Sequence, residues 1–130
     1  MTFPFWCLLV VVLMPIALAL TGGYFKTQQF GTIDNKNPRA QAAQLQGTGA
    51  RVNAAQQNAW EALAMFTPAV LVAHVAGASA TWSGVAAVVF VAARVLHAVF
   101  YVSDIDKARS LAFGVGLLCV LWLFGLAIVA

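Results

Sequence analysis

The chain has 130 residues, of which 62% are hydrophobic and only 8% carry a charge. Its mean hydropathy is +0.88, and so few polar side chains could not cover the surface of a water-soluble domain. The net charge of +3 is small and lies mainly in connecting segments, which argues against nucleic-acid binding. The composition therefore predicts an all-α integral membrane protein, with the lipid bilayer as its main partner.

A membrane-spanning helix needs about 20 mostly apolar residues, so the chain has room for four spans in one domain, residues 1–130. The apolar runs predict helices over about 3–21, 50–75, 82–102 and 108–128. The first run has no basic segment before it and carries no charge as far as Phe25, so we interpret it as a retained helix rather than a signal peptide. Gly22 and Gly23 are expected to end it. Asn37-Pro38 predicts a short amphipathic helix over 38–46.

The basic residues predict the orientation of these spans. The turn between the second and third spans carries no charge. The basic residues lie instead in or beside the two polar connections, and they are Lys26, Lys36, Arg39, Arg51, Lys107 and Arg109. Positive residues mark the cytoplasmic side. Both termini are therefore expected outside, with both charged connections in the cytoplasm, as in a bacterial inner membrane protein.

Polar side chains enter two of the predicted spans, each set on one helical face. They are Arg51, Asn58 and Glu61 in the helix over 50–75, and Arg94, His97, Tyr101 and Asp104 in the helix over 82–102. Ionisable residues inside a membrane are costly and usually functional. A purely structural polar contact between the helices is the alternative.

The two faces match in depth when Arg51 and Asp104 are taken as the cytoplasmic rim. Glu61 and Arg94 then lie ten residues inward from it, or roughly 15 Å deep. Because neither charge would be stable alone at that depth, we predict a Glu61–Arg94 ion pair, within or between subunits. Cys7 and Cys119 fall in apolar runs and are predicted to be packing residues rather than disulfide or metal ligands.

Two segments carry a family resemblance. Arg51 to Phe66, ArgValAsnAlaAlaGlnGlnAsnAlaTrpGluAlaLeuAlaMetPhe, resembles the second-helix signature of the MAPEG family, the membrane-associated proteins of eicosanoid and glutathione metabolism. ArgValLeuHisAlaValPheTyr, Arg94 to Tyr101, followed by Arg109-Ser110, is similar to the matching part of that family. The likeness is greatest to its small prokaryotic branch.

The resemblance implies a homotrimer of four-helix protomers that binds glutathione as co-substrate between adjacent subunits, in the cytoplasmic half. The positions that match glutathione contacts are Asn58, Glu61, Arg94, His97, Tyr101, Arg109 and Ser110, and Arg51 matches a basic position at the start of the second helix. Arg109 would stabilise the thiolate, with Tyr101 and Ser110 as supporting donors. No metal is implied.

Three functions are consistent with these residues. The first is a glutathione- or thiol-dependent transferase or peroxidase acting on lipophilic electrophiles. The second is a non-catalytic member that binds a lipid or serves as an accessory subunit of a larger membrane complex. Gln57, in place of a common arginine, and Phe113, in place of a tyrosine, favour the second. The third, a small exporter driven by an intramembrane carboxylate, lacks the expected acid in its first helix.

Overall fold

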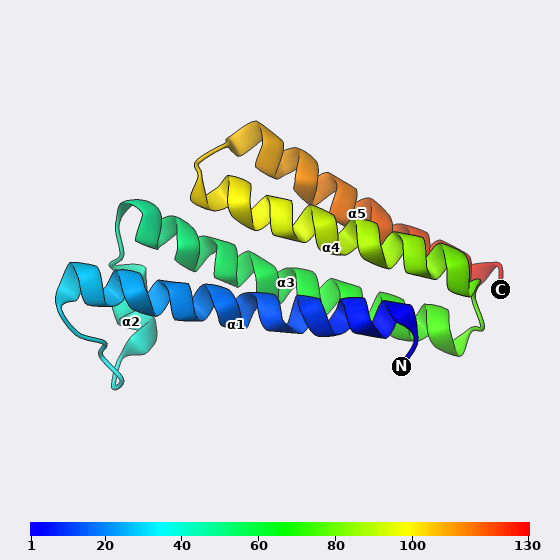
Figure 1. Cartoon of the computed structure of the whole chain (residues 1–130), viewed down its shortest axis with the longest axis horizontal. Helices are drawn as coiled ribbons and strands as arrows, with labels where there is room; N and C mark the ends of the chain where they lie inside the picture. The colour runs from blue at the N-terminus through cyan, green and yellow to red at the C-terminus, as the bar shows by residue number, and fades with distance from the viewer.

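The computed structural model describes residues 1–130 and contains only helices and their connections. Four helices are long and one is short: α1 (Phe3–Phe30), α2 (Pro38–Ala43), α3 (Gly47–Val75), α4 (Ala80–Val102) and α5 (Asp106–Ile128). Figure 1 shows both termini at one end of the bundle and α2 at the other. We refer to the end that holds α2 as the polar end.

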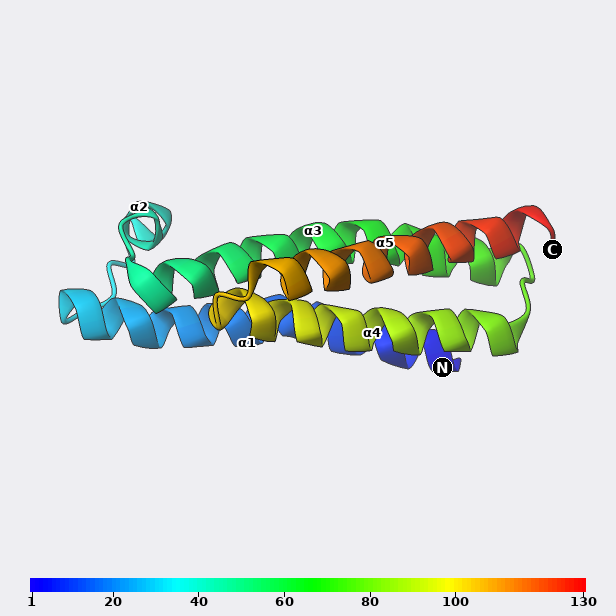
Figure 2. The ribbon, with the colours of Figure 1, turned by 90° about the horizontal axis from the view of Figure 1, so that it is seen from above.

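The four long helices pack as two layers of two. Figure 2 shows α1 and α4 in one layer and α3 and α5 in the other. Helix α3 contacts every other helix, whereas α1 and α5 lie diagonally opposite and do not touch. Polar side chains of α3 can therefore contact α4 and α5 on one side of the helix and α1 and α2 on the other.

Three helices, α1, α4 and α5, are long and apolar enough to cross a membrane. Helix α3 has 29 residues and sufficient length, but the polar side chains of its first half exclude it from that group. The sequence predicted four membrane-spanning helices, and three of the four long helices qualify by length and composition. The assignment of α3 as a fourth span stays a prediction.

Helix α1 is longer than the sequence predicted. It continues through Gly22 and Gly23 to Phe30 and ends at Gly31, which adopts the left-handed conformation with φ 77°. Tertiary contacts hold the extra turns, because the Gln29 side chain donates to the Gln44 carbonyl (2.9 Å) and accepts from the Gln46 amide (3.0 Å). Two bonds of about 1 kcal/mol each offset the roughly 1 kcal/mol that each of the two interior glycines costs the helix.

The connection between α1 and α2 is fixed by two side chains. Gln41 donates to the Thr32 carbonyl (2.9 Å) and accepts from the Asp34 amide (3.0 Å). The Asp34 carboxylate in turn accepts from the amides of Lys36 (2.8 Å) and Asn37 (3.1 Å). Hydrogen bonds from Asn37 and then Lys36 lower the pKa of Asp34 from its usual 3.8. The short helix ends at Ala43 rather than at the predicted Gln46, and α3 begins at Gly47 rather than near Ala50.

The apolar core lies toward the end that holds the termini. At its centre the rings of Phe66 and Phe90 stack at 4.0 Å, and Leu123 and Val11 are almost fully buried around them. Cys7 and Cys119 are free and belong to this core, which confirms that they are packing residues. The polar contacts between α3 and α4 lie in the other half of the bundle, toward the polar end.

Candidate functional site

Arg51 forms the rim of the candidate site at the polar end. Its Nε donates to the Val102 carbonyl (3.0 Å), and its Nη2 donates to the Thr48 hydroxyl (3.1 Å). Its Nη1 lies 4.0 Å from the Asp104 carboxylate. An exposed ion pair at this distance contributes little, so the carbonyl bond is the main link. Arg51 joins the start of α3 to the end of α4, at the depth the sequence predicted for the rim.

Arg94 is the centre of the site. Its side chain is only 3% exposed, and its Nη2 donates to both the Asn58 side-chain oxygen and, at 3.5 Å, the Asn58 carbonyl. The Nε has no hydrogen-bond partner. Gly116 of α5 packs against the side chain, since an added Cβ there would lie 3.4 Å from Arg94 Cδ, at contact distance. Gly116 thus brings α5 into contact with the buried arginine of α4.

The direct Glu61–Arg94 ion pair predicted from depth does not form within the protomer, where the one ion pair is Arg51–Asp104. Asn58 lies between the two charges instead, because its amide nitrogen also donates to Glu61 Oε2 (3.2 Å). The physical reason is the length of the arginine side chain, which directs its guanidinium toward the polar end. Within the protomer, matching α-carbon depths therefore misplaced the guanidinium by about one turn, and a pairing between subunits stays a prediction.

His97 is held by the same guanidinium. Its Nδ1 lies 3.3 Å from Arg94 Nη2, and because a guanidinium can only donate, this nitrogen must accept. The remaining proton of the neutral ring is therefore on Nε2. The His97 ring also meets Tyr101 edge-on at 5.6 Å and Phe113 at 6.4 Å. His97 is thus oriented on both sides, by a charge and by aromatic rings.

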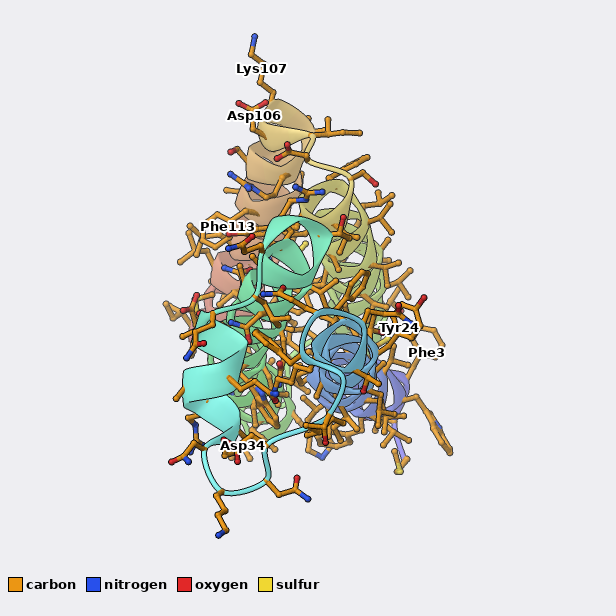
Figure 3. The ribbon with its side chains drawn as sticks, turned by 90° about the vertical axis from the view of Figure 1, so that its left-hand side faces the viewer. Phe3, Tyr24, Asp34, Asp106, Lys107 and Phe113 are labelled. Atoms are coloured by element: carbon orange, nitrogen blue, oxygen red, sulfur yellow. The ribbon has the colours of Figure 1, made fainter.

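Tyr101 and Arg109 complete the site where α4 meets α5. The Arg109 guanidinium carbon lies 4.3 Å from the centre of the Tyr101 ring, a cation–π contact. Arg109 stands in the first turn of α5, so the positive end of the helix adds to its charge. In Figure 3, viewed onto the polar end, Asp106 and Lys107 mark this start of α5 and Asp34 lies at the far side.

Most of the predicted site residues come together in one connected cluster. It is formed by Asn58, Glu61, Arg94, His97, Tyr101 and Arg109. Arg51 stays at the rim, and Ser110 is exposed and joins no side chain of the cluster. Thr48 was missed by the sequence reasoning, and only its spacing of three residues from Arg51 could have suggested it.

The fold and site define a class: helical integral membrane proteins with a buried cationic site toward one end of the helix bundle. Within that class the chain belongs to the MAPEG family, whose family model matches residues 3–129. This confirms the family resemblance stated from Arg51–Phe66 and Arg94–Tyr101. Comparisons with curated proteins and with solved structures found no match.

Proposed function

We propose that the chain is a membrane-embedded, glutathione- or thiol-dependent transferase or peroxidase that acts on lipophilic electrophiles. One observation carries the proposal: Arg94 and Arg109 lie in one connected cluster, and neither is bound to a carboxylate. Two unpaired guanidinium groups in a partly desolvated place favour an anionic ligand. Glutathione supplies two carboxylates and a thiol that can ionise.

The roles follow from position. Arg109, at the positive end of α5, stabilises the thiolate. Arg94 and His97 Nε2 are donors for a carboxylate or carbonyl of the thiol ligand. In transfer, the thiolate sulfur forms a bond to the electrophilic atom, whose leaving group departs or whose displaced electron pair takes a proton. Tyr101 is a hydrogen-bond donor beside that step, and Ser110 is a donor only if ligand or a neighbouring subunit reaches it.

The proposal includes a homotrimer of four-span protomers. Gln57 and Glu61 are exposed on α3 in the single protomer, one turn apart. Glu61 lies fourteen residues into the helix, about 21 Å from its start. An ionised side chain at that depth is unstable against lipid. This face is therefore proposed to meet other copies of the chain, which would place Glu61 beside the neighbouring subunit's polar side chains.

The orientation is part of the same proposal. The basic residues gather at the polar end, so this end is assigned to the cytoplasm of a bacterial inner membrane and both termini to the outside. The site then opens toward the aqueous pool in which a thiol such as glutathione would be dissolved. Lipophilic electrophiles would enter from the bilayer.

Glutathione binding to purified protein tests the proposal. We expect millimolar glutathione to raise the unfolding temperature, and an ultraviolet thiolate band to appear on binding. Arg109→Ala should remove the thiolate band, whereas Lys107→Ala, the same charge loss two residues away, should leave it. No stabilisation, or a thiolate band that survives Arg109→Ala, would contradict the assignment.

A second candidate is a non-catalytic member of the family that binds a lipid or another membrane complex. Phe113 favours it, because this residue brings a ring without a hydroxyl to within 6.4 Å of His97. The exposed position of Ser110 favours it too, since Tyr101 is then the one hydroxyl in the cluster. Stable co-purification with a larger complex, without any thiolate band, would select this function.

A further inference from the structure

A small cavity lies at the opposite end of the bundle from the candidate site, where all four long helices meet. Figure 1 shows this end, which holds both termini and the turn between α3 and α4. The cavity has a volume of about 60 Å³ and is lined by Thr2, Pro4, Val70, His74, Ala78, Ala80, Ser83 and Leu123. We call it the terminal cavity. It shares no residue with the cluster around Arg94 and Arg109 or with the face of α3 that carries Gln57 and Glu61, so it is a separate feature.

The Ser83 hydroxyl is the polar group at the floor of the terminal cavity. Ser83 is 7% exposed, and its Oγ has no hydrogen-bond partner in the chain. The side chains of Val70 and Leu123, which line the same floor, are apolar and almost fully buried. Buried hydroxyl groups in folded proteins are usually satisfied, by the protein or by a bound molecule, because an unpaired one costs stability. The unpaired Ser83 hydroxyl in the lining therefore points to an occupant.

The mouth of the cavity supplies further donors from the starts of two helices. The Ala80 amide, the first of α4, donates to no other group of the chain. Thr2 precedes α1, and its hydroxyl makes no capping bond. His74 is held by the ring of Phe5, edge-on at 4.9 Å, and it keeps a ring N–H in either neutral tautomer. The first amides of a helix favour an anion, because they are free and lie at the positive end of the helix dipole.

The acceptors around the cavity are already occupied. The last carbonyls of α3 accept from the turn that follows it: the Ala73 carbonyl accepts from the Ala78 amide (3.0 Å), and the His74 carbonyl accepts from the Gly77 amide (3.1 Å). No carboxylate lines the cavity, so a cation would find no charged ligand there. The free polar groups are donors, and the complementary ligand is therefore an anion.

The size and the charge of the cavity narrow the choice of anion. A water molecule takes about 10–15 Å³ of a volume measured in this way, so the cavity holds about four of them, which excludes glutathione or a nucleotide. No lysine or arginine lines it. A doubly charged ion would therefore stay uncompensated beside the apolar side chains of Val70 and Leu123. A monovalent ion of halide size needs only the N–H and O–H donors that are present.

We propose that the terminal cavity binds one monovalent anion of halide size, with chloride as the natural ligand. The Ser83 hydroxyl and the Ala80 amide, three residues apart on one side of α4, donate to the ion from below and beside it, and Thr2 and His74 close the mouth. The bound ion links the starts of α1 and α4 to the end of α3. The inference depends neither on thiol chemistry nor on the proposed membrane orientation.

The first experiment is a thermal unfolding titration of the purified full chain in detergent. Chloride replaces gluconate at constant ionic strength, so that general screening does not change. We expect chloride to raise the unfolding temperature of the wild type with a saturable midpoint. Ser83→Ala should raise that midpoint by about ten- to a hundredfold, because a hydrogen bond to a charged group is lost. In gluconate alone Ser83→Ala should be at least as stable as the wild type. Ser103→Ala, an exposed hydroxyl loss at the polar end, is the control and should titrate as the wild type does.

A second measurement locates the ion directly. Crystals soaked in bromide should show one anomalous peak per chain within hydrogen-bond distance of Ser83 Oγ, and this peak should be absent from Ser83→Ala. Four results would each overturn the proposal: no chloride shift, the same midpoint in Ser83→Ala and the wild type, an equal shift with sulfate, or water alone in the cavity of the soaked crystals. Ser83→Ala should leave the glutathione thiolate band unchanged. A missing thiolate band beside an intact chloride shift would contradict the proposed function and not the anion site.

Discussion

Asn58 provides the sharpest test of how the buried cluster is held together. It is the one residue that contacts both Arg94, on α4, and Glu61, one turn along α3. Replacing it by alanine keeps the helix and removes the side-chain acceptor of Arg94. The guanidinium would keep only the carbonyl of residue 58, at 3.5 Å, and His97 Nδ1, at 3.3 Å.

The magnitude follows from the burial of Arg94, which is 3% exposed and cannot turn to water. A hydrogen bond to a charged group is worth about 1.5–3 kcal/mol, and the lost Asn58–Glu61 bond at 3.2 Å adds less because Glu61 is exposed in the protomer. We expect Asn58→Ala to lower the free energy of unfolding by roughly 2–3 kcal/mol. The assay is reversible unfolding in mixed micelles of a mild detergent and dodecyl sulfate.

A double-mutant cycle separates this pairing from general damage to α3. In the background of Arg94→Met there is no guanidinium to satisfy, so Asn58→Ala should cost less than about 1 kcal/mol. Asn53→Ala, on the same helix but away from Arg94, is the control and should change stability by no more than about 0.5 kcal/mol. Equal losses in both backgrounds would refute the role assigned to Asn58, as would a wild-type stability of the single variant.

Three further outcomes follow from other parts of the molecule. Hydrogen bonds lower the pKa of Asp34 below 3.8, so the stability that its carboxylate gives the loop is complete above pH 3.8 and is lost as pH falls through the lowered pKa. Hydrogen exchange at the amide of residue 37, corrected for intrinsic rates, should show this loss in the wild type and not in Asp34→Asn. The buried Ser83 hydroxyl has no partner in the chain, so Ser83→Ala should leave the free energy of unfolding unchanged or raise it. Thr67→Val, which removes a 2.8 Å bond to a carbonyl, should lower the free energy of unfolding by about 1 kcal/mol. Gln29→Ala should speed hydrogen exchange in the last two turns of α1 by about 30-fold, since two bonds of near 1 kcal/mol each are lost. Unchanged exchange would mean that other contacts hold these turns.

The helices were largely predictable because hydrophobic runs decide where they lie. For α3, α4 and α5 the predicted and observed ends coincide at residues 75, 102 and 128, and the starts differ by two or three residues. The end of α1 was not predictable from local signals. Its two glycines are ordinary helix-ending residues, and the bonds that Gln29 makes with the connection between α2 and α3 are distant in sequence.

The candidate site was predictable as a set of residues but not as a set of contacts. Helical spacing put Asn58, Arg94 and His97 on facing sides of two helices, and the structure brings them together. Spacing gives the depth of an α-carbon, however, and Arg94 has a side chain longer than one helical turn. The choice between Glu61 and Asn58 as its partner was therefore decided by side-chain reach, which the sequence pattern does not contain.

Helix α3, the one long helix that is too polar to qualify as a span, has a consequence for how the protein is made. Charged residues at the centre of an inserting helix each cost about 2.5–3.5 kcal/mol on insertion scales, so α3 would not partition from the translocon into lipid by itself. Its partner for Asn58 is Arg94 of α4, which leaves the ribosome later, and a four-residue turn over 76–79 joins the two helices. We therefore expect α3 to wait beside α1 until α4 has been synthesised, and the two to enter the bilayer together as a hairpin.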